Sequence, residues 1–393
     1  MDTQNTPVHI RLWHRDFWLL SLANFLLSAM VYMYIPILPR HLQECHSFSL
    51  NEVGAVFLAY GIGLYLLGGF TQYLVQRYRR NRVCYLEILA LTLLQSTMYF
   101  NEHLPISHNL NFALALTVAL LSGALMGLAK MTLNSTLVID TCESFMRTEA
   151  NYSSSWFGRI SLALGPVAGL VASQLFGFKS TVLIGCGMGL MAYLLVKTPK
   201  FPFRAPDENL SLWSSDRYFL IQGIPLFLVM VMVSAAAAVM ITSAIGYKFF
   251  AFMFCGFLLS MISEKFVFKD ADLKSEPVTG LLCMLAAILL VILRKMAVVE
   301  ILTPVLLAFG LGIVATRFLL FFIKLSRHCQ RGTSQSTYFL GWETGLALGL
   351  AFSYGLLAGD EVRIYFSALT LTLLPLLVYN FIVHPWYIRN KNR

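Results

Sequence analysis

The sequence predicts an all-α polytopic membrane protein, in which twelve transmembrane helices form two related six-helix bundles around a central cavity. Its 393 residues are 58% hydrophobic and 12% charged, with a mean hydropathy of +0.69. Soluble globular chains are about 45–50% apolar and about 25% charged. The apolar residues also fall into runs of membrane-spanning length, and one segment of the first half recurs in the second.

The apolar runs predict helices, because a transmembrane helix needs about 20 mostly apolar residues, whereas barrel strands are shorter and alternate. The run 218–263 is too long for one crossing, so we expect two helices joined by a tight turn near the segment ITSAIG. The twelve predicted spans are residues 17–38, 52–73, 83–100, 111–138, 152–176, 180–196, 218–240, 245–263, 278–293, 301–323, 336–357 and 363–383.

The distribution of Lys and Arg predicts the orientation. Twelve spans place both termini on one side, and the segments of that side carry 20 Lys and Arg residues against six on the other. Positive charge is enriched in cytoplasmic loops, so we expect both termini in the cytoplasm. The same loops account for the net charge of +9 without a nucleic-acid partner. Short loops of this kind favour a bacterial inner (plasma) membrane.

The polar, proline-containing segment 197–216 separates the sixth span from the seventh. It reads as a cytoplasmic linker. The predicted domains are therefore an N-terminal six-helix bundle at 1–196, this linker, and a C-terminal six-helix bundle at 217–393.

An internal repeat supports the division into two bundles. With an offset of 184 residues, Arg147 aligns with Arg331 and the tetrapeptide LALG at 162–165 aligns with LALG at 346–349, without a gap over 19 positions. Two parallel six-helix repeats related by an axis along the membrane normal are a known transporter plan.

With twelve spans, a six-plus-six division and a cytoplasmic middle loop, the chain resembles the major facilitator superfamily of secondary transporters. The loop between spans two and three keeps the basic run of the family's gating motif at Arg77, Arg79 and Arg80. The motif's acid is replaced by Gln76. The resemblance implies that these arginines belong to the cytoplasmic gate. It also implies that the contact by which the family's acid helps to hold this gate closed is missing at Gln76.

A second motif concerns span five, where SLALGPVAGL matches the exporter and antiporter pattern of the family at Gly165, Pro166 and Gly169. A proline removes a helical hydrogen bond and glycines permit close helix approach. This partial match favours efflux. The arginine that many proton-coupled members carry in span four falls at Ala119, so that route to proton coupling is absent.

Charged residues within the spans are the main candidate site. Arg159 and Glu343 each lie 12 residues beyond an arginine of the repeat, about 18 Å along a helix axis and so near mid-membrane. A buried ion costs several kcal/mol unless it is paired or hydrated. We therefore expect an internal, partly wet cavity in which the two pair across the halves or contact substrate. A fixed structural pair is the alternative.

Two further cations, Lys130 and Arg317, lie nearer the cytoplasmic face, where snorkelling is an alternative to a functional role. Three cations against one acid favour an anionic or zwitterionic solute, and Glu343 is the candidate for proton coupling. Asn24, Tyr32, Gln222 and Tyr338 are candidate polar contacts.

The predicted function is secondary active transport of a small solute, anionic or amphipathic, by alternating access, with efflux favoured over uptake. A solute uptake permease and a transporter-like sensor or receptor without transport are the alternatives. An enzyme is not expected, because the sequence has no clustered catalytic residues, and the lack of a P-loop argues against ATP-driven pumping. Neither cysteines nor histidines show metal-ligand spacing, so we expect no metal site and no cofactor, and a monomer in the lipid bilayer.

Overall fold

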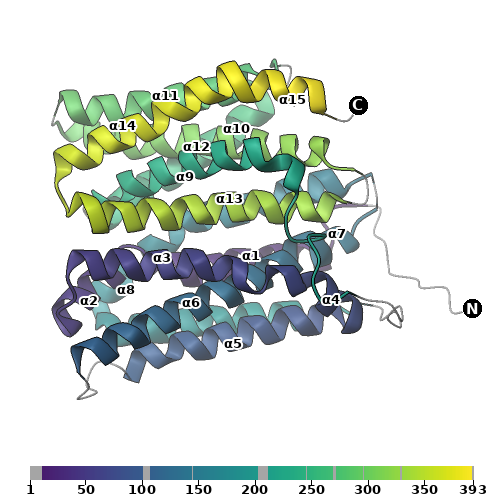
Figure 1. The fold of residues 1–393 in the computed structure, drawn as a ribbon, viewed down its shortest axis with the longest axis horizontal. Helices are drawn as coiled ribbons and strands as arrows, with labels where there is room; N and C mark the ends of the chain where they lie inside the picture. Colours follow the sequence, from purple (N-terminus) through teal and green to yellow (C-terminus); the bar gives the residue numbers. More distant parts are fainter. Residues whose placement is uncertain are drawn as a thin grey trace, which may run out of the picture.

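The computed structural model describes residues 11–100, 107–143, 145–201, 211–244, 246–268, 271–294, 296–327 and 330–391. These residues form helices that run roughly along the long axis of the molecule (Figure 1). Helices of the first half of the chain form one layer and those of the second half form the other. The helices α2 and α4 lie at opposite ends of the first layer, and α15 lies at the same end as α4.

The N-terminal half covers the first six predicted spans. A non-helical glycine, Gly177 (φ 79°), interrupts the long helix α8, at the predicted boundary between spans five and six. The elements of the N-terminal half are α1 (Arg15–Tyr32), α2 (Leu38–His46), α3 (Leu50–Leu66), the 3-10 helix η1 (Gly68–Phe70), α4 (Thr71–Arg77), α5 (Arg80–Phe100), α6 (His108–Thr132), the π-helix η3 (Leu133–Leu137), α7 (Val138–Asp140) and α8 (Arg147–Lys197).

The C-terminal half covers the last six predicted spans. The predicted turn within 218–263 is confirmed, because one helix ends at Thr242 and the next begins at Tyr247. The elements are the 3-10 helix η4 (Ile221–Gly223), α9 (Ile224–Thr242), α10 (Tyr247–Phe266), α11 (Ser275–Leu293), α12 (Ala297–Leu325), α13 (Arg331–Phe352), the π-helix η6 (Ser353–Leu357), α14 (Glu361–Val378), the π-helix η7 (Tyr379–Val383) and α15 (His384–Asn390). Residues 202–210 of the predicted linker lie outside the described residues.

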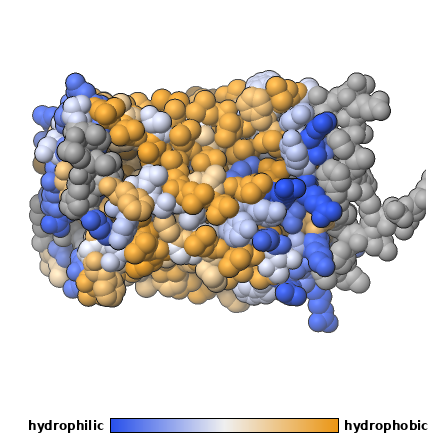
Figure 2. Space-filling view, turned by 90° about the horizontal axis from the view of Figure 1, so that it is seen from below, coloured by the Kyte–Doolittle hydropathy of each residue, from blue (hydrophilic) through white to orange (hydrophobic). Residues whose placement is uncertain are grey.

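Apolar side chains form a belt around the middle of the molecule, and hydrophilic ones gather at its two ends (Figure 2). In the described part of the chain, nine helical stretches are long and apolar enough to cross a membrane. The helices α1 and α13 are not among the nine. The first begins with Arg15 and Asp16, and the second carries Glu343 and a polar run at 333–338. Both nevertheless pack within the same layers as the apolar helices.

Close packing joins the two halves along α3 and α13. A Cβ atom on Gly54 would lie 2.8 Å from the carbonyl oxygen of Ala351, and one on Gly61 would lie 2.9 Å from the Cβ of Ala347. Only glycine allows this approach at both positions. The polar face of α13 is thereby brought against the N-terminal half.

Candidate functional site

A cluster of buried polar and charged side chains lies between the halves, where α1, α6 and α8 meet α12 and α13. Helical spacing explains the arrangement, because residues four apart share one face of a helix, as Asn24, Ser28 and Tyr32 do on α1. A small pocket of about 30 Å³ lies in the cluster. Its lining residues are Asn24, Tyr32, Lys130, Asn134, Ser155, Gly158, Arg159, Gln335, Tyr338, Phe339, Trp342 and Glu343.

Glu343 of α13 is held by hydroxyl groups of the N-terminal half. Its side chain is 1% exposed. Tyr32 donates a hydrogen bond to Oε1, and Tyr60 of α3 lies 3.4 Å from Oε2 as a second donor. The indole of Trp342 donates to the Tyr32 oxygen over 3.1 Å, which orients that hydroxyl toward the carboxylate. The carboxylate is therefore a contact between halves.

Lys130 of α6 supplies the charge that faces Glu343. The residue is 4% exposed, and its Nζ donates to Oδ1 of Asn24 and, over 2.7 Å, to Oγ of Ser28. It lies 5.6 Å from the ring centroid of Phe339 on α13 and interacts electrostatically with Glu343. A buried cation of one half and a buried acid of the other thus line one pocket, although no hydrogen bond or ion pair joins these two described side chains.

Arg159 of α8 lies in the same pocket as Glu343, but no hydrogen bond or ion pair joins these two described side chains. Its guanidinium donates to the Tyr338 hydroxyl over 3.2 Å, to Thr316 of α12, and to Ser155 over 2.8 Å. The guanidinium also lies 4.7 Å from the ring centroid of Trp156. Arg159 therefore links α8 to two helices of the C-terminal half.

Glu264 of α10 is a residue that the sequence analysis missed. Its Oε2 accepts a 2.6 Å hydrogen bond from Tyr152 of α8, and its carboxylate interacts electrostatically with Arg159 and Arg317. Glu264 follows the predicted span 245–263 by one residue, so it counted as a loop charge. The only sequence signal was its position directly after an apolar run.

Two predicted residues lie outside the central cluster. Arg317 of α12 pairs with Glu276 of α11 inside the C-terminal half. Gln222 is exposed and donates to the carbonyl of Leu325 over 3.1 Å. Glu276 was also missed. Each of the three cations therefore has an acid close by, so the positive excess expected from the sequence is absent here.

A larger cavity of about 460 Å³ reaches Glu343 from the N-terminal half. Tyr32 and Glu343 line both this cavity and the small pocket, and Tyr60 lines the cavity beside them. The two spaces thus meet at one carboxylate. Volumes of this size are typical of small-molecule sites.

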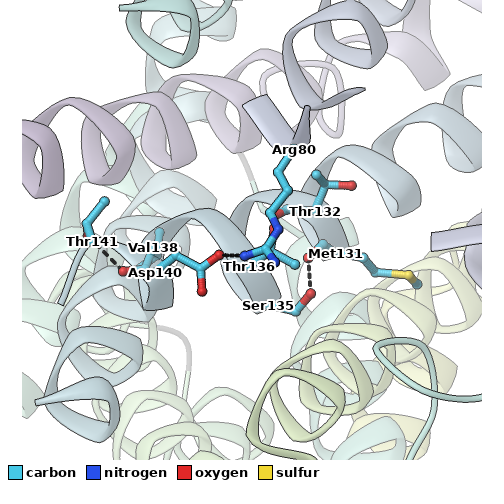
Figure 3. Close-up of polar contacts among 8 residues, drawn as sticks. All are labelled: Arg80, Met131, Thr132, Ser135, Thr136, Val138, Asp140 and Thr141. Carbon is cyan, nitrogen blue, oxygen red and sulfur yellow. Dashed lines mark hydrogen bonds and ion pairs between the residues drawn. The ribbon is translucent and has the colours of Figure 1, made fainter. Parts of the chain in front are cut away.

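The predicted gate arginines lie at the end of the molecule that holds α4 and α7. Arg80, the first residue of α5, pairs with Asp140 of α7 beside the π-helix η3 (Figure 3). Arg77 and Arg79 are exposed. An acid therefore does face this basic run, but it comes from the end of the fourth predicted span and not from Gln76.

Residues 211–220, at the end of the predicted linker and the start of the second half, contact the N-terminal half at the same end. The amide of Ser214 donates to the carbonyl of Gly69 over 3.0 Å, and the Tyr218 hydroxyl donates to the carbonyl of Tyr65 over 3.2 Å. Burial lowers the pKa of the nearby Arg217 guanidinium, and the charge of Asp216 opposes that shift. One backbone hydrogen bond and one side-chain hydrogen bond thus join this segment to the N-terminal half.

The partial exporter motif lies where α8 packs on α1. A Cβ on Gly165 would lie 3.0 Å from the carbonyl oxygen of Ala29, and one on Gly169 would overlap the carbonyl of Met33. Pro166 is buried between these glycines. The motif residues therefore form a tight helix contact within the N-terminal half.

Within the described residues, no group of three or more His, Cys, Asp or Glu side chains is placed to hold a metal ion. The contacts made between the halves in this cluster are hydrogen bonds, such as those from Tyr32 and Tyr60 to Glu343 and from Arg159 to Tyr338 and Thr316.

Comparison with known proteins agrees with this architecture. A profile of the Major Facilitator Superfamily matches residues 20–350. No curated protein matches the sequence. A bacterial homologue of the iron transporter ferroportin, in an outward-facing state, is similar in structure at 15% identity and a TM-score of 0.67. The alignment covers 93% of this chain and 99% of that one.

A mutant form of the nucleoside transporter NupG is similar at 13% identity and a TM-score of 0.61, over 95% of this chain and 99% of that one. At these identities the likeness shows the fold alone. The predicted fold class is confirmed, with its twelve helices in two six-helix bundles. The matched profile covers most of the chain, and the chain therefore belongs to the Major Facilitator Superfamily of membrane transporters.

Proposed function

We propose that this chain is a secondary active transporter that exports an amphipathic solute by alternating access. The observation that carries the proposal is that two buried and oppositely charged residues of different halves, Lys130 and Glu343, line one small pocket. Alternating access requires the two halves to move against each other. A buried pair that is made between halves contributes to the energy of that movement, because separating the charges leaves each one unpaired in apolar surroundings.

Glu343 is the residue at which proton binding couples to transport. Its partners Tyr32, Tyr60 and Lys130 all belong to the N-terminal half. A proton on the carboxylate removes the charge that attracts Lys130 and weakens the contact between the halves. Protonation at low pH therefore favours separation at this level, and deprotonation favours the arrangement described above.

The balance of charge favours an amphipathic solute over an anion. An acid interacts with each of the three cations, Lys130, Arg159 and Arg317. None of the three is therefore an uncompensated positive charge that would bind an anionic group. Export is supported by the tightly packed Gly165–Gly169 segment, which matches the exporter pattern in part. We place both termini in the cytoplasm of a bacterial cell, in its inner membrane, and expect the protein to act as a monomer.

The test is solute counterflow in liposomes. Solutes that raise the melting temperature of the purified protein are tested for exchange of labelled against unlabelled solute, over a range of pH. We expect exchange by the native protein and a net flux that responds to pH. Glu343→Gln should fold like the native protein but lose the pH response. Glu300→Gln is the matched control, because Glu300 lies exposed on α12.

Three results would change the assignment. Binding without counterflow by the native protein would support a sensor instead of a transporter. Net accumulation only in the inward direction would support an uptake permease. A Glu343→Gln protein with the native pH response would remove Glu343 from the coupling mechanism.

A further inference from the structure

The last helical stretch of the chain is longer than a bilayer requires. Glu361–Asn390 has 30 residues, which is about 45 Å along a helix axis, whereas the hydrocarbon core is about 30 Å thick. Its last element, α15, lies at one of the two ends of the molecule where hydrophilic side chains gather (Figures 1 and 2). We therefore expect the end of α15 among the lipid headgroups, and η7 below it in hydrocarbon.

One face of this stretch forms a surface pocket of about 320 Å³. Its lining residues are Phe381, Ile382, Pro385, Trp386, Arg389 and Asn390. They recur every four residues, so they form one stripe along the helix. Phe381 and Ile382, at the deeper end, are 70% and 64% exposed. The described protein thus leaves this stripe, which we call the α15 groove, open to the bilayer.

The outer end of the α15 groove holds hydrogen-bond donors without protein partners. Arg389 is exposed, and its guanidinium makes no hydrogen bond or ion pair with the described residues. The indole N–H of Trp386 also donates to none of them, although Asn390 donates to the backbone carbonyl of Trp386 over 2.8 Å. The lining contains no Asp or Glu. Residues three apart are neighbours on a helix, so the guanidinium and the indole can bind the oxygens of one phosphate.

The surroundings of the groove add positive charge. Lys391 follows the groove, and Lys391 and Lys274 both act electrostatically on His384. Asp272 opposes them with one negative charge. With Arg389 this makes three cations against one acid. Such a site favours an anionic headgroup over a zwitterionic one, whose ammonium finds no acid in the groove.

The two ends of the groove together identify the occupant. Phe381 lies about 12 Å below Arg389 along the helix axis, whereas the headgroup region of one leaflet is only about 5–8 Å thick. A ligand that is held at Arg389 and also covers Phe381 must therefore extend from the headgroups into hydrocarbon. Free phosphate is too short to do so, and a water-soluble protein does not reach that depth.

We propose that the α15 groove binds one anionic phospholipid, with its phosphate at Arg389 and the indole of Trp386 and its acyl chains along Phe381 and Ile382. Clusters of Lys and Arg just beyond a transmembrane helix attract anionic headgroups, and tryptophans are enriched at headgroup level. The groove shares no residue with the pocket between the halves. The inference goes beyond the proposed function and does not depend on it.

The test is native mass spectrometry of the purified full-length protein, which counts the lipids that remain bound. The probes are phosphatidylglycerol and phosphatidylcholine with the same acyl chains, and glycerol 3-phosphate as a headgroup without chains. We expect one phosphatidylglycerol per protein at low lipid concentration. Phosphatidylcholine should bind more weakly, and glycerol 3-phosphate least.

Two matched pairs of variants locate the site. Arg389→Gln should weaken phosphatidylglycerol binding about tenfold. Arg327→Gln, which removes the same charge from an exposed position beyond α12, should not. Trp386→Phe removes a neutral donor and should weaken binding by a smaller factor, about threefold. Trp213→Phe, at a position that is 63% exposed, is its control.

Equal binding of the two phospholipids would overturn the anionic class, and equal weakening by Arg389→Gln and Arg327→Gln would show a general attraction instead of a site. Glycerol 3-phosphate that binds as tightly as phosphatidylglycerol would exclude a lipid as the occupant. A dimer that Arg389→Gln dissociates would assign the groove to a second copy of the chain. If Arg389→Gln does not fold, Trp386→Phe decides, and native affinity of that variant would overturn the site.

Discussion

Two sets of opposite charges in this molecule differ in what they join. Lys130 and Glu343 belong to different halves and line one buried pocket, whereas Arg317 and Glu276 form an ion pair between neighbouring helices of the C-terminal half. In the proposed alternating access, two helices of one bundle stay together, whereas two helices of different bundles separate. Under that proposal, the location of a buried ion, more than its depth, decides whether it stabilises the fold or takes part in movement.

The largest expected effect tests the pair inside the C-terminal half. Arg317→Met leaves Glu276, whose side chain is 4% exposed, as an unpaired buried charge, which should cost about 3–5 kcal/mol of unfolding free energy. Denaturant unfolding measures the loss. The double variant Arg317→Met, Glu276→Gln should recover most of it and keep native counterflow. Loss of transport by a well-folded double variant would contradict a purely structural role.

A smaller effect is expected at a contact between the halves. Tyr152→Phe removes the hydrogen bond to Glu264, and bonds to charged groups contribute about 1.5–3 kcal/mol. Loss of this hydrogen bond should move the halves apart at the end of the molecule that holds α4 and α7. Spin labels at the exposed positions 79 and 327 detect this movement as a longer distance between them.

The matched control is Tyr193→Phe, which removes an exposed hydroxyl elsewhere on α8. It should leave the distance unchanged. An unaltered distance in Tyr152→Phe would show that Glu264 does not hold the halves together.

The smallest effect is expected at the half-exposed pair Arg80–Asp140. Its side chains are 33% and 25% exposed, and such pairs contribute about 0–1 kcal/mol. Arg80→Gln should therefore lower the melting temperature by no more than a few degrees, compared with Arg79→Gln as the exposed control. A large loss of counterflow with native stability would instead assign Arg80 to the gate.

The fold could be predicted largely from the sequence, because apolar length is a local property that the bilayer requires of every span. Glycines and turn residues then marked the breaks, as at Gly177 and between Thr242 and Tyr247. The helices α1 and α13 were also predicted as spans, at 17–38 and 336–357, although neither is among the nine described stretches that are long and apolar enough to cross a membrane.

The candidate site was predicted in part. Charge inside an apolar run marked Arg159, Glu343 and Lys130, since such charge needs a partner. The identity of the partner is a tertiary property, so the sequence left open whether Arg159 and Glu343 pair directly or contact substrate. In the structure Glu343 accepts from Tyr32 and Tyr60 and lines one pocket with Lys130. Glu264 was missed because its helix extends beyond the apolar run, and the cavity in the N-terminal half was missed because empty volume has no sequence pattern.

The polarity of α13 has a consequence for how the chain is made. A charged residue at the centre of a nascent helix costs about 2.5–3.5 kcal/mol on insertion scales, and α13 carries Glu343 with a run of hydroxyl and amide side chains before it. During biosynthesis this helix would leave the translocon late, when α1 and α3 are already in the bilayer to receive its carboxylate.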